Sequence, residues 1–441
     1  IWLQQLALTL PAFSEEFGIS ENRIRYTTCF LSVGLCIGAA FWGIGCDIMG
    51  RRMAFNLTLM ISGVFGVLLG ASPSWTSICV LNLIVGFGIG GNLPVDGALF
   101  LEFLPNASGN LLTLLSVWWS LGSLVVSLIA WGYMGGSFPP DKAWRYFLYT
   151  MGALTFFMFL MRFFVFHLLE SPKYLLSQGR QPEAVAVVHG LAYRNKTTTW
   201  LTEDLLNKIG GHPEVAPVEV LSTGQIIRRK ISSFSTKRIN PLFETRELGR
   251  STVLLWLCWL AIGIGYPLFN CFLPQYLSGG KSSSGEQVSS YQTYRNLAIT
   301  SATGAPGSIL ASYLVNVRYI GRKGTMAIST LLCGIMIFLF TTSRTSSSQL
   351  LFSALESFFQ NAMYGTMYAY TPEIFPAPVR GTGTGISSLL NRIGGLSAPL
   401  IAANTPPGNS TIPIMISGAM ILFSAFAMLF LSVETRDRQI I

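Results

Sequence analysis

Charged residues are scarce in this chain. Only 11% of its 441 residues are charged, whereas 51% are hydrophobic and the mean hydropathy is +0.50. Soluble domains carry roughly 25% charged residues, so this chain has too little polar surface to cover a soluble globule. The same apolar excess excludes intrinsic disorder. We therefore expect a polytopic membrane protein.

Motifs for metal, redox and nucleotide chemistry are also missing. The three histidines lie outside the middle of any apolar run, which excludes a histidine proton relay within the membrane, and no P-loop is present. We therefore expect no enzymatic activity, no metal site and no cofactor. The seven cysteines form no C-x-x-C pair, and we interpret them as buried, inert thiols: Cys29, Cys36, Cys46, Cys79, Cys258, Cys271 and Cys333.

A glycine-rich segment, G-x-G-x-G-G at residues 86–91, lies inside an apolar run rather than after a strand. This position favours close packing of membrane helices over nucleotide binding.

The chain has a net charge of +9, but its basic residues fall between apolar runs. This pattern orients a membrane protein and does not indicate a nucleic-acid partner. Every second connection between apolar runs lies on the same side of the membrane as residues 169–250. That side then holds twenty Lys and Arg residues, and the opposite side holds seven. The richer side is expected to be cytoplasmic.

Eleven apolar runs of 19 residues or more are long enough to cross a hydrocarbon core roughly 30 Å thick. A shorter run at 1–11 is interpreted as the outer end of a first, truncated helix, which makes twelve. The predicted cores are 26–46, 53–71, 76–101, 110–134, 144–168, 252–273, 292–316, 324–342, 349–371, 384–404 and 412–432.

These runs predict an all-α membrane protein with two six-helix bundles related by pseudo-twofold symmetry. The expected units are an N-terminal half at 1–168, a cytoplasmic central loop at 169–250, a C-terminal half at 251–433 and a cytoplasmic tail at 434–441. Short helices are expected in the central loop, notably from Pro182 to Tyr193, because proline suits a first helical turn.

An internal repeat supports this division. Gly50 and Glu102 are 52 residues apart, and so are Gly321 and Glu373, with an offset of 271 residues between the two pairs. Basic residues follow both glycines, and Pro lies three residues after both acids. A duplicated six-helix unit follows, and two such halves around a central site are the architecture of alternating-access transporters.

Three motifs resemble those of the major facilitator superfamily. The loop from Gly43 to Arg52 is similar to its signature loop, and residues 170–175 (ESPKYL) to an element of its sugar-porter-like branch. Residues 372–376 (PEIFP), followed by Arg380, resemble the loop between the tenth and eleventh helices of that branch. Segments 90–95 and 265–269 resemble transporters related to synaptic vesicle glycoproteins. Since residues 254–273 lack the Gln-Gln pair of sugar porters, we do not expect hexose transport.

Charges at the cytoplasmic helix ends can form an ion-pair network, since charges of opposite sign complement helix termini. Such a network can lock the outward-facing state and break when the halves rock. The alternative is that the arginines only fix topology. Resemblance implies the same arrangement in the second half, so that the candidate gating residues are Asp47, Arg51, Arg52, Glu102, Glu170, Arg322, Lys323, Glu373 and Arg380.

Polar residues inside the apolar runs are candidates for substrate binding or proton coupling. Charges near a bilayer centre cost roughly 2.5–3.5 kcal/mol on insertion scales, so they usually face a cavity or a partner. The candidates are Asn92, Asp96, Trp118, Trp119, Asn270, Glu356, Gln360, Asn361, Tyr364, Asn391 and Arg392.

Several of these residues allow two interpretations. Asp96 either binds protons or substrate, or caps a helix broken at Pro94. Glu356 either couples protons or lies near water at the outer surface, and Arg392 either pairs with Glu356 or meets an anionic substrate. Trp118 and Trp119 are cavity walls or packing residues. We prefer Asp96 as the proton carrier, because an ion pair with Arg392 would hold Glu356 ionised.

Together these features predict a secondary active transporter for a small organic solute, with an organic anion favoured and protons as the coupling ion. The expected setting is the lipid bilayer of the plasma membrane rather than an internal vesicle, and the expected functional unit is a monomer. The alternative is a transporter-like receptor or vesicle membrane component without net flux.

The orientation can be tested by labelling. A cysteine introduced by Thr198→Cys, within the central loop, should be inaccessible to an impermeant maleimide applied to sealed cells and should react after permeabilisation. A cysteine at Ser283, in a loop expected outside, serves as the matched control and should react in sealed cells. The reverse pattern would overturn the orientation.

Overall fold

The computed structural model describes most of the chain. The described residues are 2–91, 113–136, 138–165, 169–177, 179–210, 225, 239–278, 289–375, 380–406 and 411–435.

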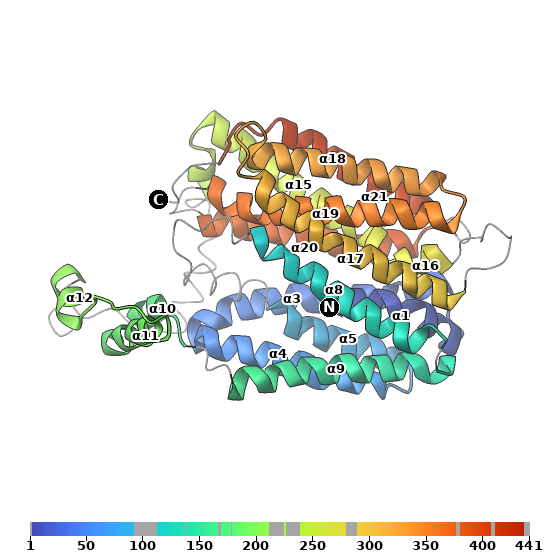
Figure 1. Cartoon of the computed structure of the whole chain (residues 1–441), viewed down its shortest axis with the longest axis horizontal. Helices are drawn as coiled ribbons and strands as arrows, with labels where there is room; N and C mark the ends of the chain where they lie inside the picture. The colour runs from blue at the N-terminus through green and yellow to red at the C-terminus, as the bar shows by residue number, and fades with distance from the viewer. Residues whose placement is uncertain are drawn as a thin grey trace.

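The described helices form two groups of long, roughly parallel rods that lie side by side (Figure 1). The first group contains α1 (Trp2–Phe17), α2 (Glu21–Ile24), α3 (Tyr26–Met49), α4 (Arg51–Gly70), α5 (Trp75–Gly90), α8 (Ser116–Met134) and α9 (Pro140–Phe164). The second contains α15 (Arg246–Asn270), α16 (Leu273–Ser278), α17 (Ser290–Leu314), α18 (Gly321–Thr342), α19 (Ser346–Ile374), α20 (Arg380–Ala403) and α21 (Thr411–Leu429).

Three short helices precede the second group: α10 (Pro172–Ser177), α11 (Gln181–Arg194) and α12 (Glu203–Gly210). They project beyond one end of the bundle, which we call the inner end, and the opposite end is called the outer end (Figure 1). A 3₁₀ turn, η1 (Asn240–Phe243), leads into α15.

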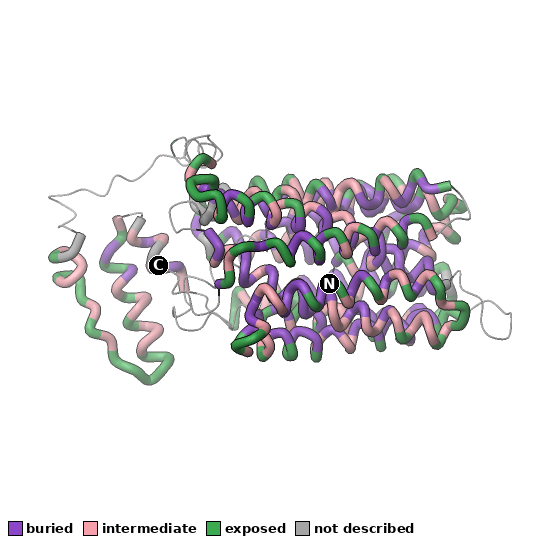
Figure 2. The backbone as a smooth tube through the Cα atoms, turned by 90° about the horizontal axis from the view of Figure 1, so that it is seen from above, coloured by how far each residue is buried: buried purple, intermediate pink, exposed green. Residues whose placement is uncertain are grey.

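The predicted all-α membrane fold is confirmed. The twelve predicted runs correspond to α1, α3, α4, α5, α8, α9, α15, α17, α18, α19, α20 and α21. Within the described residues, seven helices are long and apolar enough to cross a membrane. Exposed residues line the outside of the bundle over its whole length (Figure 2), as expected for a surface that faces lipid.

Helix boundaries differ from the prediction where polar residues begin a helix. The sixth span begins at Pro140 rather than residue 144, because proline is tolerated at the first helical position. The tenth begins at Ser346 rather than 349, where Thr345 and Ser348 form a capping box. Apolar patterning marks the lipid-buried length of a helix and misses these polar first turns.

Glycines bring neighbouring helices into backbone contact. An added Cβ at Gly38 would lie 2.1 Å from the carbonyl oxygen of Phe87, and one at Gly86 would lie 2.4 Å from that of Leu31, so α3 and α5 touch. The predicted packing role of residues 86–91 is thereby confirmed. In the second group, Gly307 of α17 approaches the carbonyl oxygen of Phe358 of α19 in the same way, at 2.1 Å.

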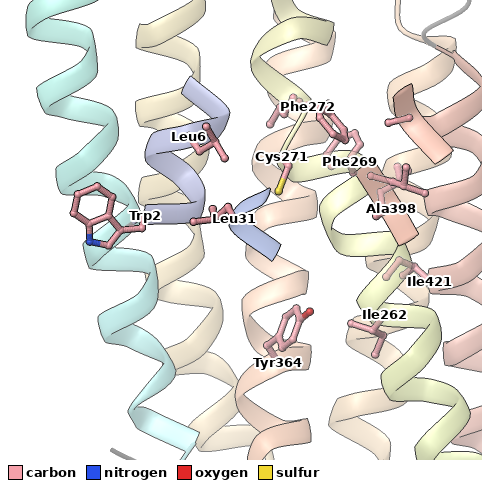
Figure 3. Packing of buried hydrophobic residues seen from close by; sticks show 14 of the residues in the cluster. Trp2, Leu6, Leu31, Ile262, Phe269, Cys271, Phe272, Tyr364, Ala398 and Ile421 are labelled. Atoms are coloured by element: carbon pink, nitrogen blue, oxygen red, sulfur yellow. The ribbon is translucent and has the colours of Figure 1, made fainter. Parts of the chain in front are cut away.

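Large apolar side chains fill the interior of the bundle. Leu6, Leu31 and Phe272, from α1, α3 and the segment after α15, belong to one buried cluster and are at most 1% exposed (Figure 3). Six of the seven cysteines are buried and none of the seven forms a disulfide bond, in agreement with the predicted inert thiols. The bundle is therefore densely packed around these residues.

The glycine contacts can be tested by adding one methyl group. Gly38→Ala should lower the apparent Tm of the purified protein by several degrees, because overpacking costs roughly 1–3 kcal/mol. Thermal unfolding in detergent, followed by tryptophan fluorescence, measures this change.

Gly132→Ala on α8 is the matched control, because nothing lies within 4 Å of its added Cβ. Alanine has the higher helix propensity, so this variant should be unchanged or slightly more stable. An apparent Tm for Gly38→Ala at or above that of Gly132→Ala would contradict the close packing.

Candidate functional site

A cavity of about 1260 Å³ lies between the two groups of helices. It is lined by residues of α3 and α8 from the first group and of α15, α17, α19 and α20 from the second. The lining continues to Arg162 and Val165 at the end of α9 and to Arg194 of α11. The cavity therefore extends toward the inner end.

One wall of the cavity is aromatic. Trp119 of α8 contacts Tyr364 and Tyr368 of α19, with ring centroids 6.0 and 5.3 Å apart. Tyr266 of α15 meets Tyr364 edge to face at 5.4 Å, and the Tyr364 hydroxyl points toward α15 (Figure 3). Trp118 also lines the cavity and is 70% exposed. Both predicted tryptophans therefore reach the cavity.

Amide side chains form the polar part of the lining. Asn361 accepts a hydrogen bond from Ser120 Oγ at 2.8 Å and so links α19 to α8. Gln360 also lines the cavity, is only 4% exposed, and has no hydrogen-bond partner at Nε2. Asn391 Oδ1 is likewise buried without a partner. Unpaired buried amides are costly, so these groups are available to a ligand.

Arg392 and Glu356 do not form the ion pair that the sequence suggested as one alternative. Arg392 lines the cavity, donates from Nη2 to the carbonyl oxygen of Gly90 at 3.5 Å, and has no partner at Nε. Glu356 instead accepts hydrogen bonds from Asn270 Nδ2 at 3.1 Å and from the Cys333 thiol at 3.9 Å. Helical spacing shows which residues share a face but not which neighbouring helix that face meets.

Glu356 is also fully buried, with 0% exposure, so the alternative of an outer residue near water is wrong. Its second oxygen, Oε2, has no hydrogen-bond partner. Asn270, which holds the other oxygen, lines the cavity. Glu356 therefore lies directly behind the cavity wall.

Some predicted residues cannot be placed. Asn92, Asp96 and Glu102 lie outside the described residues. The backbones of Asp47, Arg51 and Arg380 belong to helices, but their side chains lie outside the described part. The roles suggested for these six residues remain predictions.

Hydrogen bonds join the two groups at the outer end. Arg25, only 3% exposed, donates to Gln275 Oε1 at 3.0 Å and to the carbonyl oxygen of Ala402 at 2.8 Å. Asn22 donates to the carbonyl oxygen of Thr405 at 2.7 Å. These bonds close the outer end of the cavity.

At the inner end, two carboxylates occupy equivalent places in the two groups. Glu170, after α9, accepts the backbone N–H of Arg52 at the start of α4 at 3.4 Å. Glu434, after α21, accepts the N–H groups of Arg322 and Lys323 at the start of α18, both at 3.1 Å. Carboxylates are stabilised at helix N-termini, where unpaired N–H groups point outward.

A glycine admits each carboxylate. Gly50 directly precedes α4 and has a φ of +94°, and Gly321 is the first residue of α18 and has a φ of +61°. Both values favour glycine. An added Cβ on either residue would lie 2.8 Å from the carboxylate of Glu170 or Glu434 respectively. Each glycine of the sequence repeat therefore makes room for an acid from the far end of its own half.

Arg322 also forms an ion pair with Glu373, and their side chains are 10% and 7% exposed. This pair joins the start of α18 to the end of α19 within the second group of helices. It brings together two predicted gating residues but does not cross between the groups.

The predicted site residues did not include Glu434, Arg25, Tyr266 and Tyr368. A signal for Glu434 exists, because Glu170-Ser171 after the sixth span is matched by Glu434-Thr435 after the twelfth. Arg25 directly precedes an apolar run, and a basic residue in that position usually only sets the orientation of a membrane helix. The two tyrosines lie in apolar runs whose packing faces the sequence does not distinguish.

Comparison with known proteins agrees with this architecture. The family profile of the Major Facilitator Superfamily matches residues 2–399 and 255–440. A relative named MFS siderochrome iron transporter 1, from Ceriporiopsis subvermispora, is 41% identical over 95% of this chain and 82% of its own length. The Synaptic vesicle 2-related protein of Bos taurus is 25% identical over 98% of this chain and 75% of its own.

A solved structure has the same fold. The xylose transporter XylE from E. coli, in a partially occluded inward open conformation, aligns with a TM-score of 0.71 at 17% identity, over 99% of this chain and 95% of that one. The resemblance to the superfamily and to proteins related to synaptic vesicle glycoproteins, inferred from sequence motifs, is confirmed.

The Arg322–Glu373 pair can be tested by a double-mutant cycle. Removal of one partner of a buried pair leaves an unpaired charge and typically costs about 3–5 kcal/mol. Arg322→Gln and Glu373→Gln should each lower the apparent Tm clearly. The loss of apparent Tm in the double variant should be smaller than the sum of the two single losses.

Arg180 and Glu183 of α11 provide the control cycle, because their side chains are 53% and 54% exposed. An exposed pair is worth about 1 kcal/mol or less, so Arg180→Gln and Glu183→Gln should have small, additive effects. Additive losses in the Arg322–Glu373 cycle would show that this pair is not a coupled unit.

Proposed function

Because the chain belongs to the Major Facilitator Superfamily, a family of transporters of small solutes rather than of enzymes, we propose that it moves a small organic anion across the membrane by alternating access, coupled to protons. It is an integral, multi-pass membrane protein. We place it in the plasma membrane and take the monomer as its functional unit.

The observation that carries the anion proposal is the charge of the cavity. Arg392 lines the cavity and its buried Nε has no hydrogen-bond partner, and the only other charged residues in the described lining, Arg162 and Arg194, are also basic. Within that described lining no carboxylate faces the cavity. An anion is therefore attracted, and a cation would meet like charge at each of these described arginines.

The proposed alternating access is supported by the unequal ends of the cavity. Hydrogen bonds of Arg25 and Asn22 close the outer end, while the lining continues to Arg194 at the inner end. With the inner end in the cytoplasm, this conformation is inward-facing. Rocking the two groups about the site would break the outer bonds and expose the cavity to the other side.

For proton coupling, we now favour Glu356 over Asp96. The sequence argument against Glu356 was an ion pair with Arg392, and the two residues do not pair. A buried carboxyl with no positive partner is more stable in its neutral form. Its described hydrogen-bond donors, Asn270 and Cys333, are uncharged, and Tyr266 is the nearby titratable group on α15.

Asn270 provides the connection between proton and substrate. It lines the cavity and also holds Glu356 Oε1. Loss of the proton would leave a charged carboxylate behind the wall, and Asn270 would then be drawn more strongly to Glu356 than to a ligand. Proton occupancy and anion binding would thus favour each other, as symport requires.

The transport test uses proteoliposomes and a panel of labelled organic anions, with a ferric siderochrome added because one relative is named for it. An inward proton gradient should drive accumulation above equilibrium, and collapse of the gradient by an ionophore should abolish it. Binding without flux in any condition would favour the receptor alternative over a transporter.

Glu356→Gln keeps the shape of the side chain but removes its acidic proton. We expect it to abolish gradient-driven accumulation and to spare exchange of internal for external substrate, because exchange needs no net proton movement. Asp96→Asn is the matched variant and should retain accumulation. If only Asp96→Asn loses it, Asp96 is the proton carrier, as expected from the sequence alone.

A further inference from the structure

We infer that the cavity selects a flat aromatic ring that carries a carboxylate, an inference that rests on the proposed transport of an organic anion. It names the substrate class of the same site. Two parts of the cavity support it: an aromatic wall with unused hydroxyl groups, and a group of unpaired polar atoms beside it.

The aromatic wall is arranged as aromatic rings prefer to pack. Tyr364 lies between Tyr266, at 5.4 Å and 81°, and Tyr368, at 6.1 Å and 27°, and Trp119 meets Tyr368 at 5.3 Å and 80°. Edge-to-face and offset contacts at such distances are favourable beyond the area they bury. A flat ligand ring can join this arrangement by the same geometry, whereas a puckered aliphatic ring cannot.

The wall also bridges both groups of helices. Trp119 belongs to α8, its ring partners Tyr364 and Tyr368 belong to α19, and Tyr266, which contacts Tyr364, belongs to α15. Trp119 remains 42% exposed although it lines an internal cavity, so its ring has a face free for a ligand. A ring bound here would touch both halves, so its binding can influence how they rock against each other.

The tyrosine hydroxyls add polarity to this wall. Among the described residues, the hydroxyls of Tyr266, Tyr364 and Tyr368 have no hydrogen-bond partner, and all three residues line the cavity. Buried phenols usually find a partner. They can donate to ring nitrogens or substituents of a ligand, so the wall suits a polar aromatic compound better than a plain hydrocarbon.

The carboxylate is assigned to the polar atoms next to the wall. Arg392, which interacts electrostatically with Tyr368, offers its unpaired Nε, and Gln360, one turn before Tyr364 on α19, offers its unpaired Nε2. Gln360 is only 4% exposed and lines the cavity. An arginine and an amide N–H beside aromatic rings match the two ends of an aromatic acid.

Binding of three probes separates the parts of this inference. Calorimetry on the purified protein would measure benzoate, cyclohexanecarboxylate, which has the same charge on a puckered ring, and benzamide, which has the same ring without charge. Benzoate should bind at least about threefold more tightly than cyclohexanecarboxylate. Benzoate should bind at least about tenfold more tightly than benzamide.

Matched variants assign the preference to residues. Tyr364→Leu removes the ring and should reduce benzoate binding about threefold while leaving cyclohexanecarboxylate nearly unchanged, and Tyr364→Phe should keep the preference. Trp119→Leu provides a second ring removal at a half-exposed position, should Tyr364→Leu fold poorly. Arg392→Gln should weaken benzoate and leave benzamide unaffected.

Equal affinity for benzoate and cyclohexanecarboxylate would overturn the aromatic part, and equal affinity for benzoate and benzamide would overturn the anionic part. Failure of all three probes to bind overturns the inference, while accumulation of another anion in the proteoliposomes would still support the proposed transport. Benzoate binding without accumulation of any solute supports the inference and contradicts the proposed transport.

Discussion

Contact between helix backbones at glycine is the constraint on which the rest of this bundle depends. Between helices in lipid there is no hydrophobic driving force, so close packing and hydrogen bonds must hold them together. Gly38 and Gly86 let α3 and α5 touch, and Gly307 does the same for α17 and α19. Each half can therefore behave as a stiff body, and the looser, polar space is confined to the boundary between the halves.

Three of the residues with unpaired polar atoms lie at this boundary. In hydrocarbon, a polar group without a partner costs several kcal/mol, so a ligand that pairs with such a group removes part of that cost. Gln360, Asn391 and Arg392 all have unpaired atoms and all line the same cavity. Glu356, one layer behind, has an unpaired oxygen but only neutral neighbours, which suits a group that exchanges a proton rather than one that binds an anion.

Much of this fold could be predicted from hydropathy, because a spanning helix needs a run of apolar residues whatever its partners are. The short helix expected at Pro182–Tyr193 is observed at Gln181–Arg194, because a proline and flanking polar residues mark its start. Partners between distant segments were not predictable. The Arg392–Glu356 pairing was wrong and Glu434 was missed, since both depend on how helices far apart in the chain are placed, and one sequence carries no direct record of that placement.

Several of the bonds that join the two halves end on main-chain oxygens. Arg25 reaches the carbonyl of Ala402, Asn22 that of Thr405 and Arg392 that of Gly90; Tyr294 likewise reaches Leu8. A carbonyl acceptor is present whatever side chain its residue carries. At these bonds the acceptor residue can change its side chain during evolution without loss of the bond, while the donor residue cannot. The bond from Arg25 to Gln275 differs, because both of its partners are side chains. Paired sequence changes across the outer end are therefore expected at Arg25 and Gln275 rather than at Ala402 or Thr405.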